Sequence, residues 1–391
     1  MPDVVVVGGG IIGTSCAYEL ARRGASVTLF EKDEIAAGAS GRNLGYLDTS
    51  KDPVLAPLAR RTLERYHEVA SESPVPFFID SDAIGTLAVT LEEEEVGDLR
   101  AWAAAAEAVE VRVSHVGPDE VRRLEAALSH GVVEAYLLDE GHRVDPGALT
   151  GAFAALAAKS GADVRHHLAA RRLIERSGRV TGVVTDDGVV EADVVVLGAG
   201  PWSAAIARPV GVSLRVAGAR GWLVHAAPGR PLVRRWIQSG ARRLLDGHGT
   251  RTDADPLVVS MREFGEGVRS HDVSPMIQPA PDGSIVAGTS REPSLAADSY
   301  DLEVPRMVVN EAVRLIPALA NAPVIATWSG VRPVSPDERP QIGRVMDGLV
   351  VATGHGSEGV ILGGASAELT AAIVLGEQPP FDPAPFDPNR F

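Results

Sequence analysis

The N-terminal strand and the glycine turn that follows it constrain the fold of this chain more than any other segment. The apolar stretch Val4–Val7 runs directly into Gly8-Gly9-Gly10-Ile11-Ile12-Gly13. Gly8 permits a tight turn, Gly10 lets the backbone approach a pyrophosphate, and Gly13 allows a helix to pack closely on the strand. The helix predicted to follow would point free N–H groups and the positive end of its dipole at that phosphate. The sequence therefore predicts a dinucleotide site.

An acid ends the second predicted strand. Glu31 follows the apolar stretch Val27–Phe30 and lies eighteen residues beyond Gly13. Its carboxylate can accept hydrogen bonds from a ribose diol, and it would repel a 2′-phosphate, which disfavours NADP. A purely structural glycine turn would leave this acid unexplained. The fingerprint does not distinguish NAD from FAD.

Composition narrows the functional classes. The net charge of −15, from 37 basic and 52 acidic residues, argues against a general affinity for nucleic acid or acidic membranes. Cys16 is the only cysteine, so intrachain disulfides and cysteine metal clusters are not expected. We expect no apolar run to approach the roughly 20 residues of a membrane span. Because the fold is expected to begin by Val4, no signal peptide is predicted, and the expected location is cytoplasmic.

The order of predicted elements indicates a discontinuous α/β chain. A second buried strand over 193–197 leads into Gly198-Ala199-Gly200 and should join the sheet of the first strand. Between 214 and 289 the pattern becomes β, which is typical of a mixed, largely antiparallel α+β domain. A loop is predicted over 332–339, ahead of a final glycine loop and helix. We therefore predict a Rossmann-like nucleotide domain formed by 1–76, 141–213 and 327–391, and a substrate domain formed by 77–140 and 214–326.

Four stretches together resemble the FAD-dependent family of D-amino-acid oxidase, glycine oxidase and sarcosine oxidase. They occur in family order and at family spacing, and the resemblance covers essentially the whole chain. The stretches are Val4–Gly13 with Glu31-Lys32, Gly38–Gly45, Gly330–Asp337 with Arg339–Gly343, and Thr353–Gly359. The resemblance implies FAD as the cofactor. Family members with covalently bound flavin attach it to a histidine near the loop after the second strand or to a cysteine near the C-terminal loop. Covalent attachment is not expected here, because residues 34–50 contain no histidine and Cys16 lies in neither place.

The resemblance also implies which residues contact FAD. The pyrophosphate and ribose would be met by Gly8, Gly10, Ile11, Ile12, Gly13, Glu31 and Lys32. The pyrophosphate would also be held, and the flavin lined, by Ala39, Ser40, Arg42 and Asn43. The isoalloxazine would lie against Leu44, Gly45 and Tyr46, with Ala170 at the adenine edge and Gly200 on the nucleotide side. The flavin pyrimidine would be wrapped by His355, Gly356, Ser357, Glu358, Gly359, Val360 and Ile361. Physical chemistry supports the last group, because backbone N–H groups at a helix N-terminus stabilise the negative charge of a reduced flavin.

Arg332 is the predicted catalytic residue. In the family, an arginine in the corresponding segment binds the substrate carboxylate, and a guanidinium can grip a carboxylate through two parallel hydrogen bonds. The alternative is an arginine paired with Asp337 or Glu338. Substrate contacts are also predicted for Met276, Gln278 and Tyr46. Ser357 stands where glycine oxidases carry a second arginine, so glycine is a doubtful substrate, and a larger or N-alkylated amino acid fits as well.

The predicted reaction is oxidation of an amine C–N bond by hydride transfer to flavin N5, giving an imine that hydrolyses. A catalytic base is not required if the amine binds deprotonated. A catalytic role for His225, His248 or His271 is therefore only an alternative to a surface or packing role. Oxygen is the expected acceptor. The alternatives are a dehydrogenase that reduces a quinone or a partner subunit, an enzyme that oxidises 2-hydroxy acids, and a non-catalytic flavin-binding or tRNA-modifying protein. A homo-oligomer also stays open.

Overall fold

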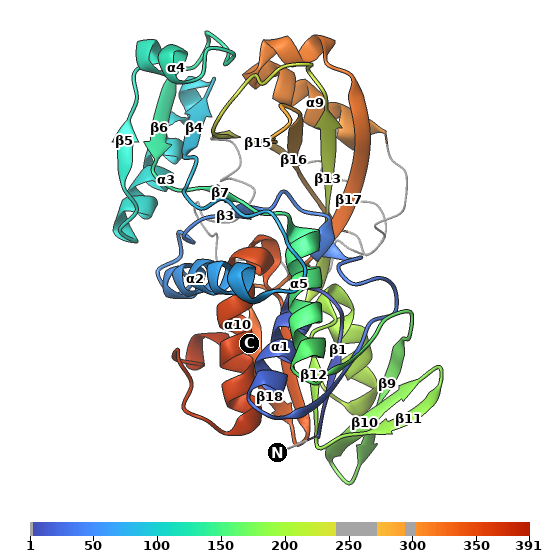
Figure 1. The fold of residues 1–391 in the computed structure, drawn as a ribbon. Coiled ribbons are helices and arrows are strands. Elements are labelled where there is room, and N and C mark those ends of the chain that lie inside the picture. The colour runs from blue at the N-terminus through green and yellow to red at the C-terminus, as the bar shows by residue number, and fades with distance from the viewer. Residues whose placement is uncertain (1–2, 240–271, 294–301) are drawn as a thin grey trace.

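A computed structural model of the chain describes residues 3–239, 272–293 and 302–391. The described residues form a mixed α/β protein built around two large sheets (Figure 1). The predicted combination of a parallel nucleotide-binding sheet and a largely antiparallel second sheet is confirmed. His248 and His271 lie outside the described residues.

The first sheet has six strands in the order β18-β19-β12-β1-β2-β8. Strand β1 pairs in parallel with β2 and β12, and β12 with β19, whereas β18 is antiparallel to β19. The strand bounds are β1 Asp3–Val7, β2 Ser26–Phe30, β8 Asp163–Arg165, β12 Val194–Leu197, β18 Gln341–Met346 and β19 Leu349–Thr353. The parallel strands end at one edge, which is where open α/β sheets bind their ligands.

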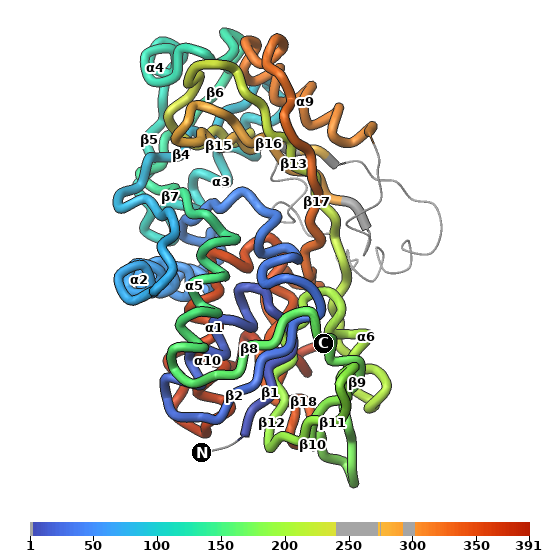
Figure 2. Tube along the Cα trace, turned by 45° about the vertical axis from the view of Figure 1, so that its right-hand side comes forward, coloured from blue at the N-terminus to red at the C-terminus, as the bar shows by residue number. Residues whose placement is uncertain are grey.

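Each face of this sheet is buried against a different layer. Val4 and Val6 of β1 join the core beneath three helices, whereas Val5 and Val7 join a second core on the opposite face. This division follows from the alternation of side chains along a strand. The helices are α1 Ile11–Arg22, α5 Pro146–Lys159 and α10 Gly359–Leu375. The other face carries a small antiparallel sheet of β9 Ala170–Arg176, β10 Arg179–Thr185 and β11 Gly188–Glu191, visible at the lower right of Figure 2.

The second sheet has eight strands in the order β17-β13-β16-β15-β14-β4-β6-β5, and the pairs are antiparallel except for β14 with β4. Its strands are β4 Thr86–Thr90, β5 Val113–His115, β6 Glu134–Leu138, β13 Ala217–Ala226, β14 Trp236–Ser239, β15 Asp272–Pro279, β16 Ile285–Pro293 and β17 Val324–Val334. Helix α9 (Glu303–Leu315) buries Val308, Ala312 and Leu315 in the core of this sheet. The shorter elements include α2 Ala56–Glu72, α3 Val96–Ala108, α4 Pro118–Leu124, α6 Ser203–Ala207, β3 Tyr46–Leu47 and β7 His142–Arg143.

Strand β17 differs from the sequence prediction. It continues through Arg332 to Val334, so the loop predicted over 332–339 begins later than expected. The strand is held in place because Ala217–Ala226 pairs along nearly its whole length. The domain boundary predicted at residue 327 therefore falls inside a continuous strand that runs from one sheet toward the other.

Among the described residues, one helical segment is long and apolar enough to cross a membrane, contrary to the expectation that none exists. It is Gly356–Leu375, which includes α10. However, 78% of its most apolar stretch is buried inside the protein. The apolar side chains of α10 therefore serve the core, where the helix packs against α1 and α2.

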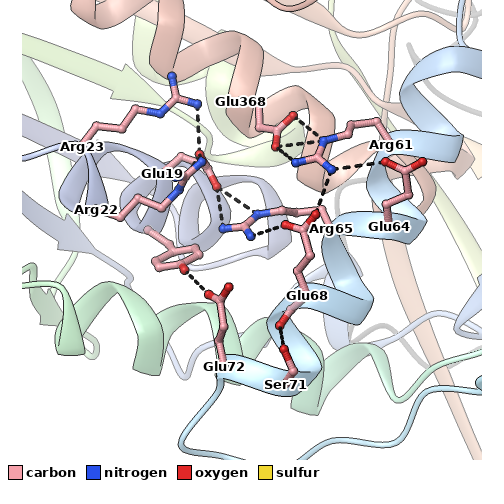
Figure 3. Close-up of polar contacts among 11 residues, drawn as sticks. Glu19, Arg22, Arg23, Arg61, Glu64, Arg65, Glu68, Ser71, Glu72 and Glu368 are labelled. Atoms are coloured by element: carbon pink, nitrogen blue, oxygen red, sulfur yellow. Dashed lines mark hydrogen bonds and ion pairs between the residues drawn. The ribbon is translucent and has the colours of Figure 1, made fainter.

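A chain of charges joins α1, α2 and α10 (Figure 3). Arg65 donates to Glu19 of α1 at 3.0 Å and to Glu68 at 2.6 Å, and Arg61 donates to Glu68 at 3.0 Å and to Glu368 of α10 at 2.6 Å. The Glu19 side chain is 1% exposed and also pairs with Arg22 and Arg23, so its charge depends on three arginines. Although burial acts to raise it, the two arginines bring the pKa of Glu68 below its ordinary value. The network fixes three helices relative to one another.

Candidate functional site

A cavity of about 850 Å³ lies where the two sheets meet. Its lining includes Val7 and Thr353 at the ends of β1 and β19, and Leu223 and Met276 from the second sheet. The volume is near the upper end of ordinary ligand sites. The cavity also receives the β1–α1 turn, the loop over 37–46 and the start of α10, which were predicted to hold the cofactor.

The β1–α1 turn leaves no room for side chains. Gly8 has φ +114°, and a Cβ on Gly13 would stand 1.9 Å from the carbonyl oxygen of Gly8. A Cβ on Gly10 would lie 3.0 Å from the Ser40 hydroxyl, which accepts the Ile11 N–H at 2.9 Å. Gly10 and the first residues of α1, Ile11 and Ile12, line the cavity, and the Ser40 hydroxyl takes up the Ile11 N–H there. These features fit a bound pyrophosphate, because backbone N–H groups and a helix dipole favour an anion there.

Glu31 shapes the turn as well as lining the cavity. Its Oε2 accepts the Gly9 N–H at 2.6 Å and its Oε1 accepts the Asp33 N–H at 2.9 Å. The carboxylate oxygens retain further acceptor capacity, so the predicted contact with a ribose is compatible with this arrangement. Lys32 pairs with Asp33 and lies 5.2 Å from the ring centroid of Trp202.

Asn43 fixes the shape of the loop over 37–46. Its amide donates to the carbonyl oxygens of Ala39 at 3.0 Å and Ser40 at 2.8 Å, and its Oδ1 accepts the Gly45 N–H at 2.8 Å. Arg42 donates to the Ser329 carbonyl of β17 at 3.3 Å, which ties this loop to the second sheet. Asn43 therefore holds neighbouring groups in position while it also lines the cavity.

The start of α10 contains two buried titratable groups. His355 is 1% exposed, and desolvation lowers its pKa to about 3, so the imidazole is neutral. Its Nε2 lies 3.1 Å from the Ser366 hydroxyl. Desolvation raises the pKa of Glu358 to about 7, against a hydrogen bond from Ser50 that lowers it. The residue is partly exposed as a whole, but its Oε2 is enclosed and has no protein hydrogen-bond partner.

Helix α10 is pressed against the start of α1. Tyr66 of α2 is fully buried and donates to the Val360 carbonyl at 2.6 Å. A Cβ on Gly363 would lie 2.7 Å from the Tyr66 hydroxyl and 3.0 Å from Cγ1 of Ile11. The first turns of α1 and α10, which are predicted to bind opposite parts of the cofactor, therefore pack closely together, and Tyr66 of α2 contacts the start of α10.

Arg332 enters the cavity from β17. Its Nη1 donates to the Ser290 carbonyl of β16 at 2.9 Å. The guanidinium occupies space that a side chain at Gly221 would take, since a Cβ there would stand 2.3 Å from Nη1. The two acids weighed as its partners have ion pairs of their own, Asp337 with Arg390 at 2.8 Å and Glu338 with Arg291 at 2.5 Å.

An apolar and aromatic wall adjoins the arginine. Met276 is 1% exposed and clusters with Leu44, Leu223 and Trp236. Tyr46 packs edge-on against Trp236 at 4.7 Å, and its hydroxyl lies 2.9 Å from that of Thr86. Burial raises the pKa of Tyr46 well above its ordinary value, so the phenol is neutral.

Most predicted site residues lie on this one cavity. The residues that line it are Gly8, Gly10, Ile11, Ile12, Glu31, Lys32, Ala39, Ser40, Arg42, Asn43, Leu44, Tyr46, Ala170, Gly200, Met276, Arg332, His355, Gly356, Ser357, Glu358, Gly359, Val360 and Ile361. Gly13 and Gly45 stand behind the lining, where each makes a close backbone approach. Gln278 is not among the lining residues, and neither is His225, which meets the Ser284 hydroxyl at 2.8 Å.

Several lining residues were not predicted. Gln238 of β14 is paired in register with Met276 and lines the cavity in place of Gln278. A polar run between β3 and α2 also reaches it through Asp48, Ser50, Lys51 and Asp52. This polar run comes shortly after the glycine loop in the sequence, and that position could have identified it as part of the same site.

Comparison with known proteins agrees with this geometry. The family model described as FAD dependent oxidoreductase (DAO) matches residues 3–373. A glycine oxidase of Pseudomonas putida is 27% identical over 99% of this chain and 98% of its own. The 4-methylaminobutanoate oxidase (formaldehyde-forming) of Paenarthrobacter nicotinovorans is 28% identical over 99% of this chain and 45% of its own. The crystal structure of glycine oxidase from Geobacillus kaustophilus superposes with a TM-score of 0.84 at 25% identity, covering 100% of this chain and 99% of that one. The chain therefore belongs to the DAO family of FAD-dependent oxidoreductases, and FAD is its cofactor.

Proposed function

We propose that this protein oxidises the C–N bond of an amino acid or an N-substituted amino acid. The observation that carries the proposal is Arg332, which projects into the cavity of an FAD-dependent oxidoreductase beside an apolar wall. The names of two relatives, glycine oxidase and 4-methylaminobutanoate oxidase, support a substrate that has both an amine and a carboxylate.

The cofactor would be held without a covalent bond. Gly8, Gly10 and the start of α1 would meet the pyrophosphate, Glu31 the ribose, and the start of α10 the flavin. Bound FAD supplies the two-electron oxidant that takes a hydride from the substrate carbon. Residues Gly356–Gly359 line the cavity at a helix start, where free backbone N–H groups would stabilise negative charge that develops during the reaction, although the Glu358 N–H is bonded to the His355 carbonyl at 3.0 Å.

The protein's own contribution is to orient the substrate. Arg332 would grip the carboxylate through two hydrogen bonds, and its position is fixed because Nη1 is already anchored on the Ser290 carbonyl. Met276 and the neutral Tyr46 would limit the space around the α-carbon and exclude water. The amine would bind deprotonated, and the imine product would hydrolyse in water. The apolar wall favours a substituent larger than hydrogen on nitrogen or carbon, so glycine would be a poor substrate.

The proposal extends to the electron acceptor, the domains and the location. Oxygen would be the electron acceptor, with a quinone or partner subunit as the alternative. The nucleotide domain would comprise 1–76, 141–213 and 327–391, and the substrate domain 77–140 and 214–326, with β17 passing between them. A cytoplasmic location and a homo-oligomeric state are compatible with the sequence, and Gln278 would act on the substrate only indirectly because it lies off the cavity.

The test is anaerobic bleaching of the flavin. Panels of amino acids, N-alkyl amino acids and 2-hydroxy acids are added to purified protein, and the compounds that bleach the flavin identify the substrate class. Arg332→Ala should weaken the apparent binding of carboxylate substrates by about 2–4 kcal/mol, the scale for a desolvated charged pair. Arg344→Ala, on the exposed side of β18, is the control.

Two outcomes would contradict the proposal. Bleaching by hydroxy acids alone would favour the 2-hydroxy-acid alternative, and unchanged kinetics of Arg332→Ala would remove the carboxylate-binding role. Formation of hydrogen peroxide on admission of air distinguishes an oxidase from a dehydrogenase.

A further inference from the structure

Two histidines and a glutamate form an exposed cluster beside the adenosine end of the cavity. Glu34 follows the end of β2, and His166 and His167 lie in the connection between β8 and β9. Strand β8 pairs with β2, so these segments run side by side (Figure 2). The cluster does not line the cavity, although the adjoining Asp33 and Ala169 do. The family's cofactor site therefore does not account for it.

The three side chains converge on one point. Glu34 Oε1 lies 2.8 Å from Nε2 of His167, and Glu34 Oε2 lies 3.3 Å from Nδ1 of His166. The ring centroids of the two histidines are 4.8 Å apart. One ligand atom from each residue lies within 4.8 Å of the other two, and within the described ranges no other group of three His, Cys, Asp or Glu meets this criterion. The cluster therefore offers two imidazole nitrogens and a carboxylate to a single position.

The backbone turns the second histidine toward the first. Consecutive side chains on an extended segment point to opposite faces. His167 instead has φ +56°, a conformation that few residues other than glycine adopt. It is held there because its N–H donates to the Asp33 carbonyl at 3.0 Å and the Leu168 N–H donates to the Glu31 carbonyl at 2.9 Å. The same bonds fasten this connection to the loop that carries Glu34.

Neighbouring positive charges are already neutralised. Lys32 pairs with Asp33, Arg165 pairs with Asp163 at 2.5 Å, and Arg171 pairs with Asp186 at 2.7 Å. A cation approaching Glu34 would therefore meet a carboxylate and two imidazole rings with little opposing charge, and it would displace the hydrogen bond between Glu34 and His167. Access needs no rearrangement, because the side chains of Glu34, His166 and His167 are 67%, 47% and 59% exposed.

We propose that Glu34, His166 and His167 form a surface site for one divalent transition-metal ion, with Zn²⁺ the preferred occupant. Two imidazoles and one carboxylate are a donor set that zinc accepts readily, and water would complete the tetrahedron. Ligand atoms in a tetrahedral site with bonds of about 2.0–2.2 Å stand about 3.4 Å apart. The separations of 2.8 and 3.3 Å therefore need only small rotations of exposed side chains. A bound ion would tie the end of β2 to the β8–β9 connection.

The test is calorimetric titration of the holoenzyme with zinc chloride. The protein carries no histidine tag and is first treated with EDTA and dialysed. The wild type should bind about one zinc ion per chain. His167→Ala and Glu34→Gln should each weaken this binding by at least about tenfold, because a metal site depends on every protein ligand. The flavin absorbance spectrum checks that both variants fold and retain FAD.

His115→Ala is the matched control. His115 is also an exposed histidine beside a glutamate, 3.4 Å from Glu134, but no second histidine joins the pair among the described residues. Its substitution should leave the zinc affinity unchanged. Absence of binding in the wild type at micromolar zinc would overturn the proposal, as would equal affinities in the wild type and His167→Ala. Neither result bears on amine oxidation, so the two proposals fail independently.

Discussion

Substitution of Glu358 by glutamine should make the protein more stable at alkaline pH. The Glu358 carboxyl stands at the start of α10, with Oε2 enclosed and without a protein hydrogen-bond partner. Burial raises its pKa from 4.5 to about 7, so the folded state disfavours the charged form. Glutamine keeps the size of the side chain and removes the charge.

The size of the effect follows from proton linkage. A group whose pKa is raised on folding contributes its full stability below its unfolded pKa, here 4.5, and that contribution is lost as the pH rises to about 7. The difference between the two pKa values corresponds to about 3 kcal/mol at most, since one pKa unit is about 1.4 kcal/mol. Partial exposure of the residue reduces this figure, and we expect the variant to gain about 2 kcal/mol over the wild type between about pH 5 and pH 8.

The assay is urea unfolding followed by tryptophan fluorescence, in excess FAD, across this pH range. The free energies of unfolding of the wild type and Glu358→Gln should agree at the acidic end and diverge as the pH rises. Glu107→Gln, an exposed substitution on α3, should give a profile parallel to that of the wild type. Parallel profiles for Glu358→Gln would show that this carboxyl titrates normally, and the reasoning would be refuted.

Three further predictions concern other parts of the molecule. Gly221→Ala should raise the KM for carboxylate substrates and leave the FAD content unchanged, because the new Cβ would lie 2.3 Å from Arg332 Nη1 and displace the guanidinium. An unaltered KM would show that Gly221 does not confine the Arg332 guanidinium. Arg65→Met should lower the free energy of unfolding by about 1.5–3 kcal/mol, because it removes one of the three arginines that pair with the buried Glu19 and leaves Arg22 and Arg23; a loss below about 0.5 kcal/mol in urea unfolding would contradict this. If zinc binds at the proposed site, saturating zinc should slow the release of FAD from the wild type but not from His167→Ala. The release is measured by the rise of flavin fluorescence, and equal slowing in both proteins would show that zinc acts at another site.

Local sequence patterns identified part of the cavity lining. The strand, glycine turn and helix around Gly8–Gly13 are adjacent in the sequence, and their conformations depend on neighbouring residues. The glycine-rich composition of 38–45 indicated a functional loop, but the roles of this loop and of 356–359 in binding FAD were implied by the family resemblance. Their arrangement around one cavity agrees with the family to which the chain belongs.

The substrate side depends on strand register, which the sequence does not show. Gln238 lines the cavity because β14 pairs with β15 so that it stands opposite Met276. A prediction from β15 alone selected Gln278, which lies two residues away from Met276 on the same strand but off the cavity. Similarly, the space for Arg332 is provided by Gly221, through the pairing of β13 with β17. These relations connect residues that are tens or hundreds of positions apart.

The arrangement of the six-stranded sheet has a consequence for biosynthesis. The turn at Gly8–Gly13 emerges early, but β19 and the start of α10 are made only after Leu349. At about 5–20 residues per second, the roughly 350 residues between these parts take roughly 20–70 seconds to translate. A ribosome-bound chain would hold an incomplete nucleotide sheet for nearly all of this time, with β12 lacking its neighbour β19. FAD should therefore load after translation rather than during it, and a cell short of flavin would accumulate full-length apoprotein rather than stalled fragments.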